Sequence, residues 1–399
     1  MIVGTRFDDD QGDSSGTAAI FRKTANGWAH EATLKGLDVQ ANDQFGAAVA
    51  IVGDWAFVSA PTYEDLSVAP NPDIGAVYVF RKVSGNWVQT QRITSPNPAT
   101  NDQFGSAIAV SGSVLAIGTI KDSHATQGTK QGAVYVYRLT GSTWIFAAKL
   151  TAPVTFSFGC SVAISPDGTK IIVGANNENS TGAQFGGAAH LFTGTNWVTR
   201  TRIIANDIAP SIMFGQDVAA GNEYFAVGAP NLGPGAVYIF NLTGQQMQKL
   251  TASDGASGDR FGGSLSMAGD TLAIGARQDG PPLNAGSVYV FSRAMGTWVQ
   301  TDKLTASPPA SSENFGQAVS ASGSDIAIGA PGYGSAPFKA GRAWVFTSGT
   351  TPPPPDPADF NNDGAVNTQD IRDVCDSSLQ GDQFKNKIRQ IIDSPNFVR

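Results

Sequence analysis

The residues best suited to chemistry in this chain of 399 residues form an acidic segment near its end, DFNNDGAVNTQD, which covers 359–370. Oxygen-bearing side chains alternate along it and a glycine takes the sixth place, as in the twelve-residue loops that wrap around Ca²⁺. The spacing predicts six calcium ligands, Ala365 through its backbone carbonyl: Asp359, Asn361, Asp363, Ala365, Asn367 and Asp370. Ca²⁺ is thus the one cofactor that the sequence predicts, and the alternative is a turn rich in Asn and Asp.

Apolar residues follow this segment at the spacing of a helix, at Ile371, Val374 and Leu379. With Asp at its last position, the run from Asn361 to Asp370 resembles a dockerin-type repeat. The resemblance implies a cohesin-like partner. Dockerins usually carry two such loops, whereas here 384–392 shows an apolar helical pattern without a second loop, so cohesin docking stays open.

No group of residues in the sequence points to catalysis. The three histidines, His30, His124 and His190, fall in different predicted elements and lack the spacing of metal ligands. Cys160 and Cys375 fall in different predicted domains, so we expect no disulfide framework. We therefore predict that the protein is not an enzyme, and leave open a pair of carboxylates brought together from separate loops.

Composition and charge exclude further classes of function. The chain has a formal charge of -7 and a pI near 5.0, without any run of Lys and Arg. Binding to nucleic acid needs a concentrated basic surface, so we expect no such partner. No apolar run reaches the length of about 18 residues that spans a bilayer, and Met1 does not open a legible signal peptide.

Two short motifs recur along the chain and predict its architecture. A Phe-Gly pair begins at each of six positions: Phe45, Phe104, Phe158, Phe214, Phe261 and Phe315. A hexapeptide that opens with Gly and ends on an aromatic residue begins at each of seven: Gly16, Gly75, Gly132, Gly187, Gly235, Gly286 and Gly341. The Phe-Gly intervals of 47 to 59 residues are typical of propeller blades or of a solenoid.

One repeat, from Phe104 to Leu150, divides into four alternating segments at 104–110, 115–118, 132–137 and 144–150, which we name strands A to D. Strand A is rich in Gly, Ala and Ser, and strands C and D carry aromatic residues. That grading suits a wedge-shaped sheet whose inner strand lies at a crowded axis. We therefore predict an all-β fold, a seven-bladed propeller with four-stranded blades.

The strand count is uneven. Segments B and C appear seven times, and A and D six times, so 26 of 28 strands are present. The first blade would lack its inner strand and the last its outer strand. We expect that the sequence starts inside its own propeller, and that a signal peptide was lost with the missing closing segment.

Strand D begins with a tryptophan in most repeats, at Trp28, Trp87, Trp144, Trp197 and Trp298. These rings could stack on sugars or pack between blades. Because one Trp occurs per repeat at a fixed strand position, the pattern favours packing.

The repeats resemble the FG-GAP family, whose propellers form integrin α-subunit heads and occur in many bacterial surface proteins. Beside the Phe-Gly pairs, Gly-Ala-Pro begins at Gly228 and Gly329. Members often bind calcium in the A to B turn, but here turns such as Gly112-Ser113 are too short to supply six ligands. The resemblance covers 1–346. We expect a proline-rich linker over 347–358 and a small helical calcium-loop tail over 359–399, a dockerin-like single EF-hand module.

The B to C and D to A loops are long and should share one face of the propeller, which is our predicted binding face. That face is acidic, with Asp8, Asp9, Asp10 and Asp13 in the first loop, and Asp43, Asp102, Asp254, Asp259 and Glu313 ahead of Phe-Gly pairs. The acids could bind calcium or a basic partner, or could simply form solvated turns.

We therefore expect a secreted or cell-surface adhesion protein, monomeric and without a membrane span, whose propeller binds a protein or a glycan. The calcium-binding tail would serve for anchoring or assembly. Two alternatives remain: an accessory or catalytic subunit of an extracellular polysaccharide-degrading system, and a structural protein of the envelope.

Overall fold

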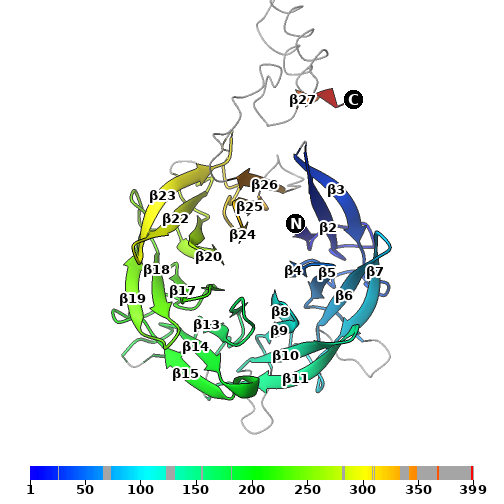
Figure 1. Cartoon of the computed structure of the whole chain (residues 1–399), viewed down its shortest axis with the longest axis horizontal. Helices are drawn as coiled ribbons and strands as arrows, with labels where there is room; N and C mark the ends of the chain where they lie inside the picture. The colour runs from blue at the N-terminus through cyan, green and yellow to red at the C-terminus, as the bar shows by residue number, and fades with distance from the viewer. Residues whose placement is uncertain are drawn as a thin grey trace, which may run out of the picture.

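The computed structural model shows seven antiparallel sheets arranged in a ring (Figure 1). It describes residues 1–25, 27–65, 73–122, 131–153, 156–180, 182–280, 284–307, 309, 311–332 and 341–347, together with two short strands near the end of the chain. Five sheets have four strands and two have three. The predicted seven-bladed propeller is confirmed, and within the described residues the first blade has no strand A and the last blade no strand D.

The strands follow the chain from blade to blade, in the order A, B, C, D within each complete blade. Blades 1 to 3 consist of β1 (Ile2–Thr5), β2 (Thr17–Thr24) and β3 (Gly27–Leu34); β4 (Val49–Val52), β5 (Trp55–Ala60), β6 (Ala76–Val83) and β7 (Asn86–Ile93); β8 (Phe104–Ser111), β9 (Val114–Thr119), β10 (Ala133–Thr140) and β11 (Thr143–Leu150). Blades 4 and 5 consist of β12 (Ser161–Ile164), β13 (Ile171–Ala175), β14 (Ala188–Thr193) and β15 (Thr199–Ile203), with the short 3₁₀ turn η1 (Thr195–Trp197); β16 (Val218–Ala220), β17 (Tyr224–Ala229), β18 (Ala236–Asn241) and β19 (Gln246–Leu250). Blades 6 and 7 consist of β20 (Phe261–Ala268), β21 (Thr271–Ala276), β22 (Ser287–Ala294) and β23 (Thr297–Thr305); β24 (Ala318–Ser322), β25 (Asp325–Ala330) and β26 (Arg342–Thr347).

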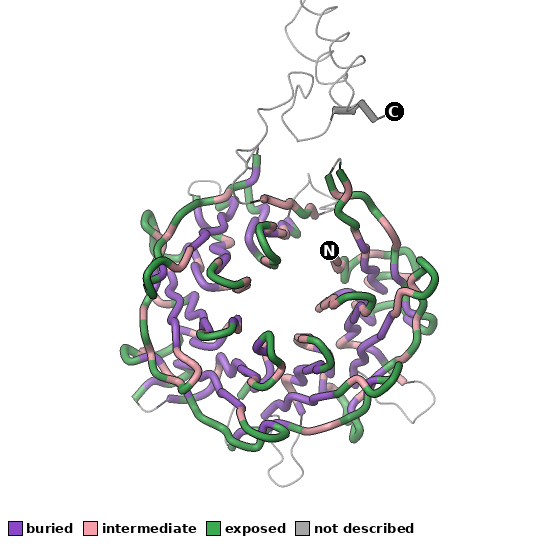
Figure 2. Tube along the Cα trace, viewed as in Figure 1, coloured by how far each residue is buried: buried purple, intermediate pink, exposed green. Residues whose placement is uncertain are grey.

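The middle strands are buried on both faces, and the outer strands on one. Strand β9 is buried along its whole length, whereas β7 alternates between exposed and partly covered residues. Each sheet of blades 2 to 6 is covered by a neighbouring sheet on either side, so its middle strands are largely shielded from water. In blade 7, β25 and β26 are only partly covered. Figure 2 shows buried segments within the blades, and exposed ones along the outer rim and at the inner ends of the blades around the centre of the ring.

Phe-Gly pairs join each blade to the one before it, as blades 3 and 4 illustrate. The Phe158 amide donates at 3.1 Å to the carbonyl of Gln131, two residues before β10 of the preceding blade. Its ring is fully buried and packs edge-on against His190 of β14, with centroids 5.3 Å apart. A Cβ on Gly118 of β9 would lie 2.2 Å from the Gly159 carbonyl oxygen, so this joint requires glycine in strand B.

Three of the five tryptophans predicted at the start of strand D pack between blades. Trp144, Trp197 and Trp298 are buried, whereas Trp28 and Trp87 are partly buried. The Trp144 ring lies edge-on to Phe57 in strand B of the preceding blade, with centroids 5.1 Å apart. Rings buried in this way present no face to a sugar, which supports the packing interpretation.

The short A–B and C–D connections share one face of the ring, which we call the turn face, and the B–C and D–A connections share the other, the loop face. Beyond Thr347 the structure describes only β27 (Val366–Asn367) and β28 (Phe397–Val398), which pair in parallel. The predicted linker and the other five calcium ligands lie outside the described residues, so the calcium loop stays a prediction. Within the described ranges no helix is long and apolar enough to cross a membrane.

Candidate functional site

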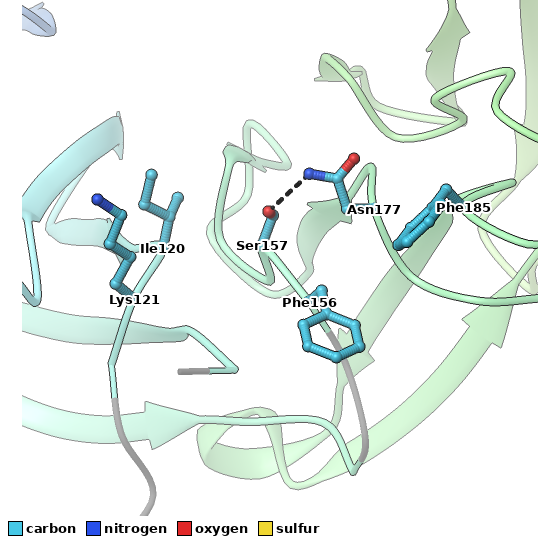
Figure 3. A pocket seen from close by; sticks show the side chains of 6 residues that line it. All are labelled: Ile120, Lys121, Phe156, Ser157, Asn177 and Phe185. Atoms are coloured by element: carbon cyan, nitrogen blue, oxygen red, sulfur yellow. Dashed lines mark hydrogen bonds between the residues drawn. The ribbon is translucent and has the colours of Figure 1, made fainter. Parts of the chain in front are cut away.

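The loop face is hollowed between blades 3 and 4 by an open groove of about 440 Å³. Its walls come from three connections: the B–C loop of blade 3, the D–A loop that leads into blade 4, and the B–C loop of blade 4. We call it the loop-face groove, and it is lined by Ile120, Lys121, Phe156, Ser157, Asn177 and Phe185 (Figure 3).

Two aromatic rings are exposed in the groove. Phe156 is 43% exposed and Phe185 is 44% exposed. A hydrogen bond fixes the backbone at Phe185, because the Phe185 amide donates to Asn179 Oδ1 at 2.9 Å. Large apolar side chains that gather at one exposed place mark a contact surface, so these rings are the first candidates for ligand contacts.

Polar groups lie between the rings and the opposite wall. Asn177 Nδ2 donates to Ser157 Oγ at 3.0 Å, as Figure 3 shows. Lys121 stands on the far side of the groove, and no ion pair joins it to another described residue. The groove therefore combines apolar faces with an amide, a hydroxyl and an ammonium group, each able to hydrogen bond to a ligand.

Phe156 replaces a structural acid. In blades 2, 3 and 6 the residue two places before the Phe-Gly pair is the buried Asp43, Asp102 or Asp259. Each of these accepts an N–H from the residue three places earlier, at 2.8, 2.8 and 2.6 Å. Blade 7 has the buried acid Glu313 at this position, and blade 5 has the buried Ile212. Burial raises the pKa of Asp43 to about 6. The structure thus supports the turn-forming interpretation of these acids, and the substitution in blade 4 places a phenylalanine at the surface.

The acids of the first B–C loop are also engaged within their own loop. Asp8 Oδ1 accepts the Asp10 amide at 3.0 Å, and Asp9 Oδ1 accepts the Ser14 amide at 2.7 Å. Asp10 pairs with Lys35 at 2.9 Å. Among the residues that the structure describes, no group of three His, Cys, Asp or Glu side chains is placed to hold a metal ion.

A cluster of a tyrosine, a basic residue and an acid recurs beneath the loop face, and sequence reasoning missed it. In blade 3, Tyr135 donates to Asp122 Oδ2 at 2.6 Å and Lys149 to Asp122 Oδ1 at 2.9 Å. The register of β10 and β11 sets Tyr135 opposite Lys149. This pairing cannot be found in the sequence unless the register of the two strands is already known. Similar clusters join Tyr78, Arg92 and Asp38, and Tyr289, Lys303 and Asp254. In each cluster the basic side chain forms an ion pair with the acid, so both charges are paired within the protein.

In blade 4 the tyrosine is replaced by His190, which is fully buried. Its Nε2 lies 2.8 Å from Glu178 and its Nδ1 lies 3.1 Å from Arg200 Nη1. A guanidinium only donates, so Nδ1 accepts and the proton is on Nε2, facing Glu178. Burial lowers the pKa of His190. Both ring nitrogens are engaged, so neither is free for a metal or a substrate.

The remaining residues singled out for chemistry lie apart. His30 is on β3 of blade 1, where it bonds to Thr33 at 3.0 Å, and His124 lies outside the described residues. Cys160 is a free cysteine among the described residues, and burial raises the pKa of its thiol to about 11, while Cys375 lies outside them. A thiol that stays protonated at neutral pH is a weak nucleophile.

The family model described as "FG-GAP repeat" matches residues 28–80, 87–137, 197–240, 245–291 and 298–346, together more than half of the chain. No curated protein matches the sequence. Each matched segment runs from the start of one strand D to strand C of the next blade. The segment 138–196 lies between two matches, and it contains Phe156, Ser157, Asn177 and Phe185. Most of the loop-face groove thus comes from the repeat that departs from the pattern of the others.

Proposed function

The chain belongs to the FG-GAP repeat family, and we propose that it is a non-catalytic interaction protein, secreted or held at the cell surface, which binds a glycan in the loop-face groove. FG-GAP repeats are typical of extracellular proteins, and their propellers commonly mediate binding. The observation that carries the proposal is the pair of exposed rings, Phe156 and Phe185, beside the hydrogen-bonded Asn177 and Ser157.

A sugar matches this mixture of groups. One face of a pyranose ring carries C–H bonds, which pack on an aromatic ring, and its rim carries hydroxyls that both donate and accept hydrogen bonds. Phe156 and Phe185 supply the apolar contacts. Asn177, Ser157 and Lys121 supply donors and acceptors within the same groove.

The size of the groove favours a glycan over a protein. Sites for small ligands typically measure about 300–1,000 Å³, and the groove of about 440 Å³ falls in that range. A protein partner would cover roughly 800 Å² on this chain, which would extend far beyond six residues. A folded protein ligand is therefore the second outcome to test.

We further propose that the tail binds Ca²⁺ through the loop 359–370 and serves in anchoring or assembly. The support is the spacing of its oxygen ligands. Calorimetric titration of the full chain with CaCl₂ should give one saturable site. Asp363→Ala should abolish it, and Asp373→Ala, which changes an acid just outside the loop, should leave it intact. A titration without saturation would contradict this part of the proposal.

Glycan and protein arrays probed with the full chain test the propeller. The expected result is binding to a defined set of glycans that disappears in the double variant Phe156→Ala, Phe185→Ala. Phe7→Ala is the matched control, since Phe7 is also on the loop face and is 62% exposed but lies in blade 1. Equal losses in both variants would mean nonspecific hydrophobic adhesion, and selective binding to proteins would overturn the glycan assignment.

A further inference from the structure

A second hollow lies on the turn face of the same two blades. It has a volume of about 560 Å³ and is formed by the A–B turns of blades 3 and 4 and the C–D turn of blade 4. Residues of all three turns take part, among them Ser113, Lys170 and Asn196. We call it the turn-face hollow, and it shares no residue with the loop-face groove.

An unusual C–D turn opens this hollow. In blade 3, Trp144 is the second residue of β11, whereas in blade 4 Trp197 comes two residues before β15 begins. Asn196 and Trp197 both have positive φ, at 54° and 56°. Consecutive residues of this kind are held in a sparsely populated backbone conformation, which is maintained only where the surroundings impose it.

Arg138 of β10 points into the space so formed. Its guanidinium carbon lies 4.5 Å from the centre of the Trp197 ring. Blade 2 offers an internal comparison, because Arg81 occupies the same strand position and lies 5.1 Å over Trp55, its cross-strand partner. In blade 3 that partner is the much smaller Val114, and the room left by the missing indole is part of the hollow.

The guanidinium is fixed by stacking while its N–H groups remain available. Among the described residues no ion pair involves Arg138. The nearest acid in the hollow, Asp167, accepts bonds from the Thr169 amide at 3.0 Å and hydroxyl at 2.7 Å. These bonds and that from Ser165 lower the pKa of Asp167 to about 2. Lys170 adds a second cation, with its Nζ 3.9 Å from Asp167.

We propose that the turn-face hollow is a second binding site, for a carbohydrate that carries a carboxylate, such as a uronic acid residue. A planar guanidinium binds a carboxylate through two parallel N–H bonds. Hydroxyl and amide groups of Ser113, Thr195 and Asn196 surround it, and these suit sugar hydroxyls. Peptides usually dock on a free sheet edge or in an apolar groove, whereas these walls are polar turns.

Calorimetric titration of the full chain with an oligosaccharide of glucuronic acid tests the site. We expect saturable binding that weakens at least tenfold in Arg138→Gln and, because the fork of donors is lost, also in Arg138→Lys. Arg81→Gln is the matched control and should bind like the wild type, as should the double variant of Phe156 and Phe185. Thermal unfolding of each variant establishes that it is folded, and Arg138→Lys retains the cation above Trp197.

Three outcomes would overturn the proposal: no saturable binding of the uronate oligosaccharide, unchanged affinity in both Arg138 variants, or equal affinity for the neutral glucose oligosaccharide. A glutamate-rich peptide is the last arm. Tighter binding of that peptide, lost in Arg138→Gln, would replace the carbohydrate assignment by an acidic protein ligand and so contradict it.

Discussion

Gln91 and Trp144 fasten two blades together through a two-way hydrogen bond. The Gln91 side-chain amide donates through Nε2 to the Trp144 backbone carbonyl at 2.9 Å, and its Oε1 accepts the Trp144 backbone N–H at 3.1 Å. Gln248 binds Trp298 in the same way between blades 5 and 6, at 2.8 and 2.9 Å. A side chain of strand D thus pairs with the backbone of the next strand D, which is the edge strand of its sheet.

Gln91→Ala should therefore destabilise the propeller. The change leaves a backbone donor and acceptor without their partner, at a cost of about 1–3 kcal/mol. Urea unfolding followed by tryptophan fluorescence measures it. Gln11→Ala, a change at an exposed loop position, should cost less than about 0.5 kcal/mol. Equal effects of the two changes would contradict the role of Gln91.

Gly118→Ala tests the joint made by the Phe-Gly pair. The new methyl carbon would lie 2.2 Å from the Gly159 carbonyl oxygen, well inside contact distance, so the two blades would have to separate. We expect a loss of at least about 3 kcal/mol, or no folded protein. Gly112→Ala is the control: no atom lies within 4 Å there, but φ is 52°, so only about 1–2 kcal/mol of backbone strain is expected. Similar losses of stability in the two variants would show that close contact between Gly118 and Gly159 does not join the blades.

The repeat was predictable from the sequence because its physical causes are local. The pair Phe104 and Gly105 recurs at intervals of 47 to 59 residues, and Tyr135 alternates with valines in a strand that is buried on both faces. The loop-face groove was not predicted, although a signal existed. Phe156 stands where Asp43 and Asp102 stand in other repeats, and comparing repeats position by position would have exposed it.

Other parts of the site were beyond sequence reasoning. Asp122, Tyr135 and Lys149 come from a loop and two strands, and only their register brings them into contact. The turn-face hollow likewise depends on Val114 lying opposite Arg138, with Trp197 of the next blade above. Residues that are brought together only by strand register and blade packing leave no periodic pattern in the sequence from which their contact could be predicted.

Lys23 and Asp325 join the first blade to the last. Lys23 Nζ lies 2.6 Å from Asp325 Oδ2, and Thr347 also donates to this carboxylate at 2.6 Å. These bonds lower the pKa of Asp325. Its contribution to stability is thus present above the unfolded pKa of about 3.9 and is lost as the pH falls through the folded value.

Lys23→Ala should cost about 0.2–1 kcal/mol near neutral pH, because the pair is partly exposed. The loss should shrink in 1 M salt and at pH 2. A double-mutant cycle with Asp325→Asn, followed by thermal unfolding, isolates the pair. A coupling energy of zero at pH 7 and low salt would show that this ion pair does not hold the ring closed.

Asp217 should give the stability of the protein a pH dependence of the opposite sign. It accepts the Leu265 amide of the next blade at 2.7 Å, and burial raises its pKa to about 7. The folded state therefore holds this proton more tightly than the unfolded state, so its contribution is complete below about pH 4 and is lost as the pH rises through 7.

Urea titrations of Asp217→Asn between pH 4 and pH 8 check this prediction. The difference in unfolding free energy, variant minus wild type, should increase with pH, since asparagine carries no charge to bury. A difference that stays constant over the range would show that Asp217 does not titrate differently in the folded protein.

The central claim is that the loop-face groove is the ligand site, and one calorimetric comparison tests it most directly. The glycan selected on the array is titrated into the full-length wild type, Phe156→Ala, Phe185→Ala and Phe7→Ala. Buried aromatic anchors often contribute 2 kcal/mol or more, so each groove variant should bind roughly thirtyfold more weakly or worse, and Phe7→Ala should match the wild type. Wild-type affinity in both groove variants, with folding intact, would contradict the account.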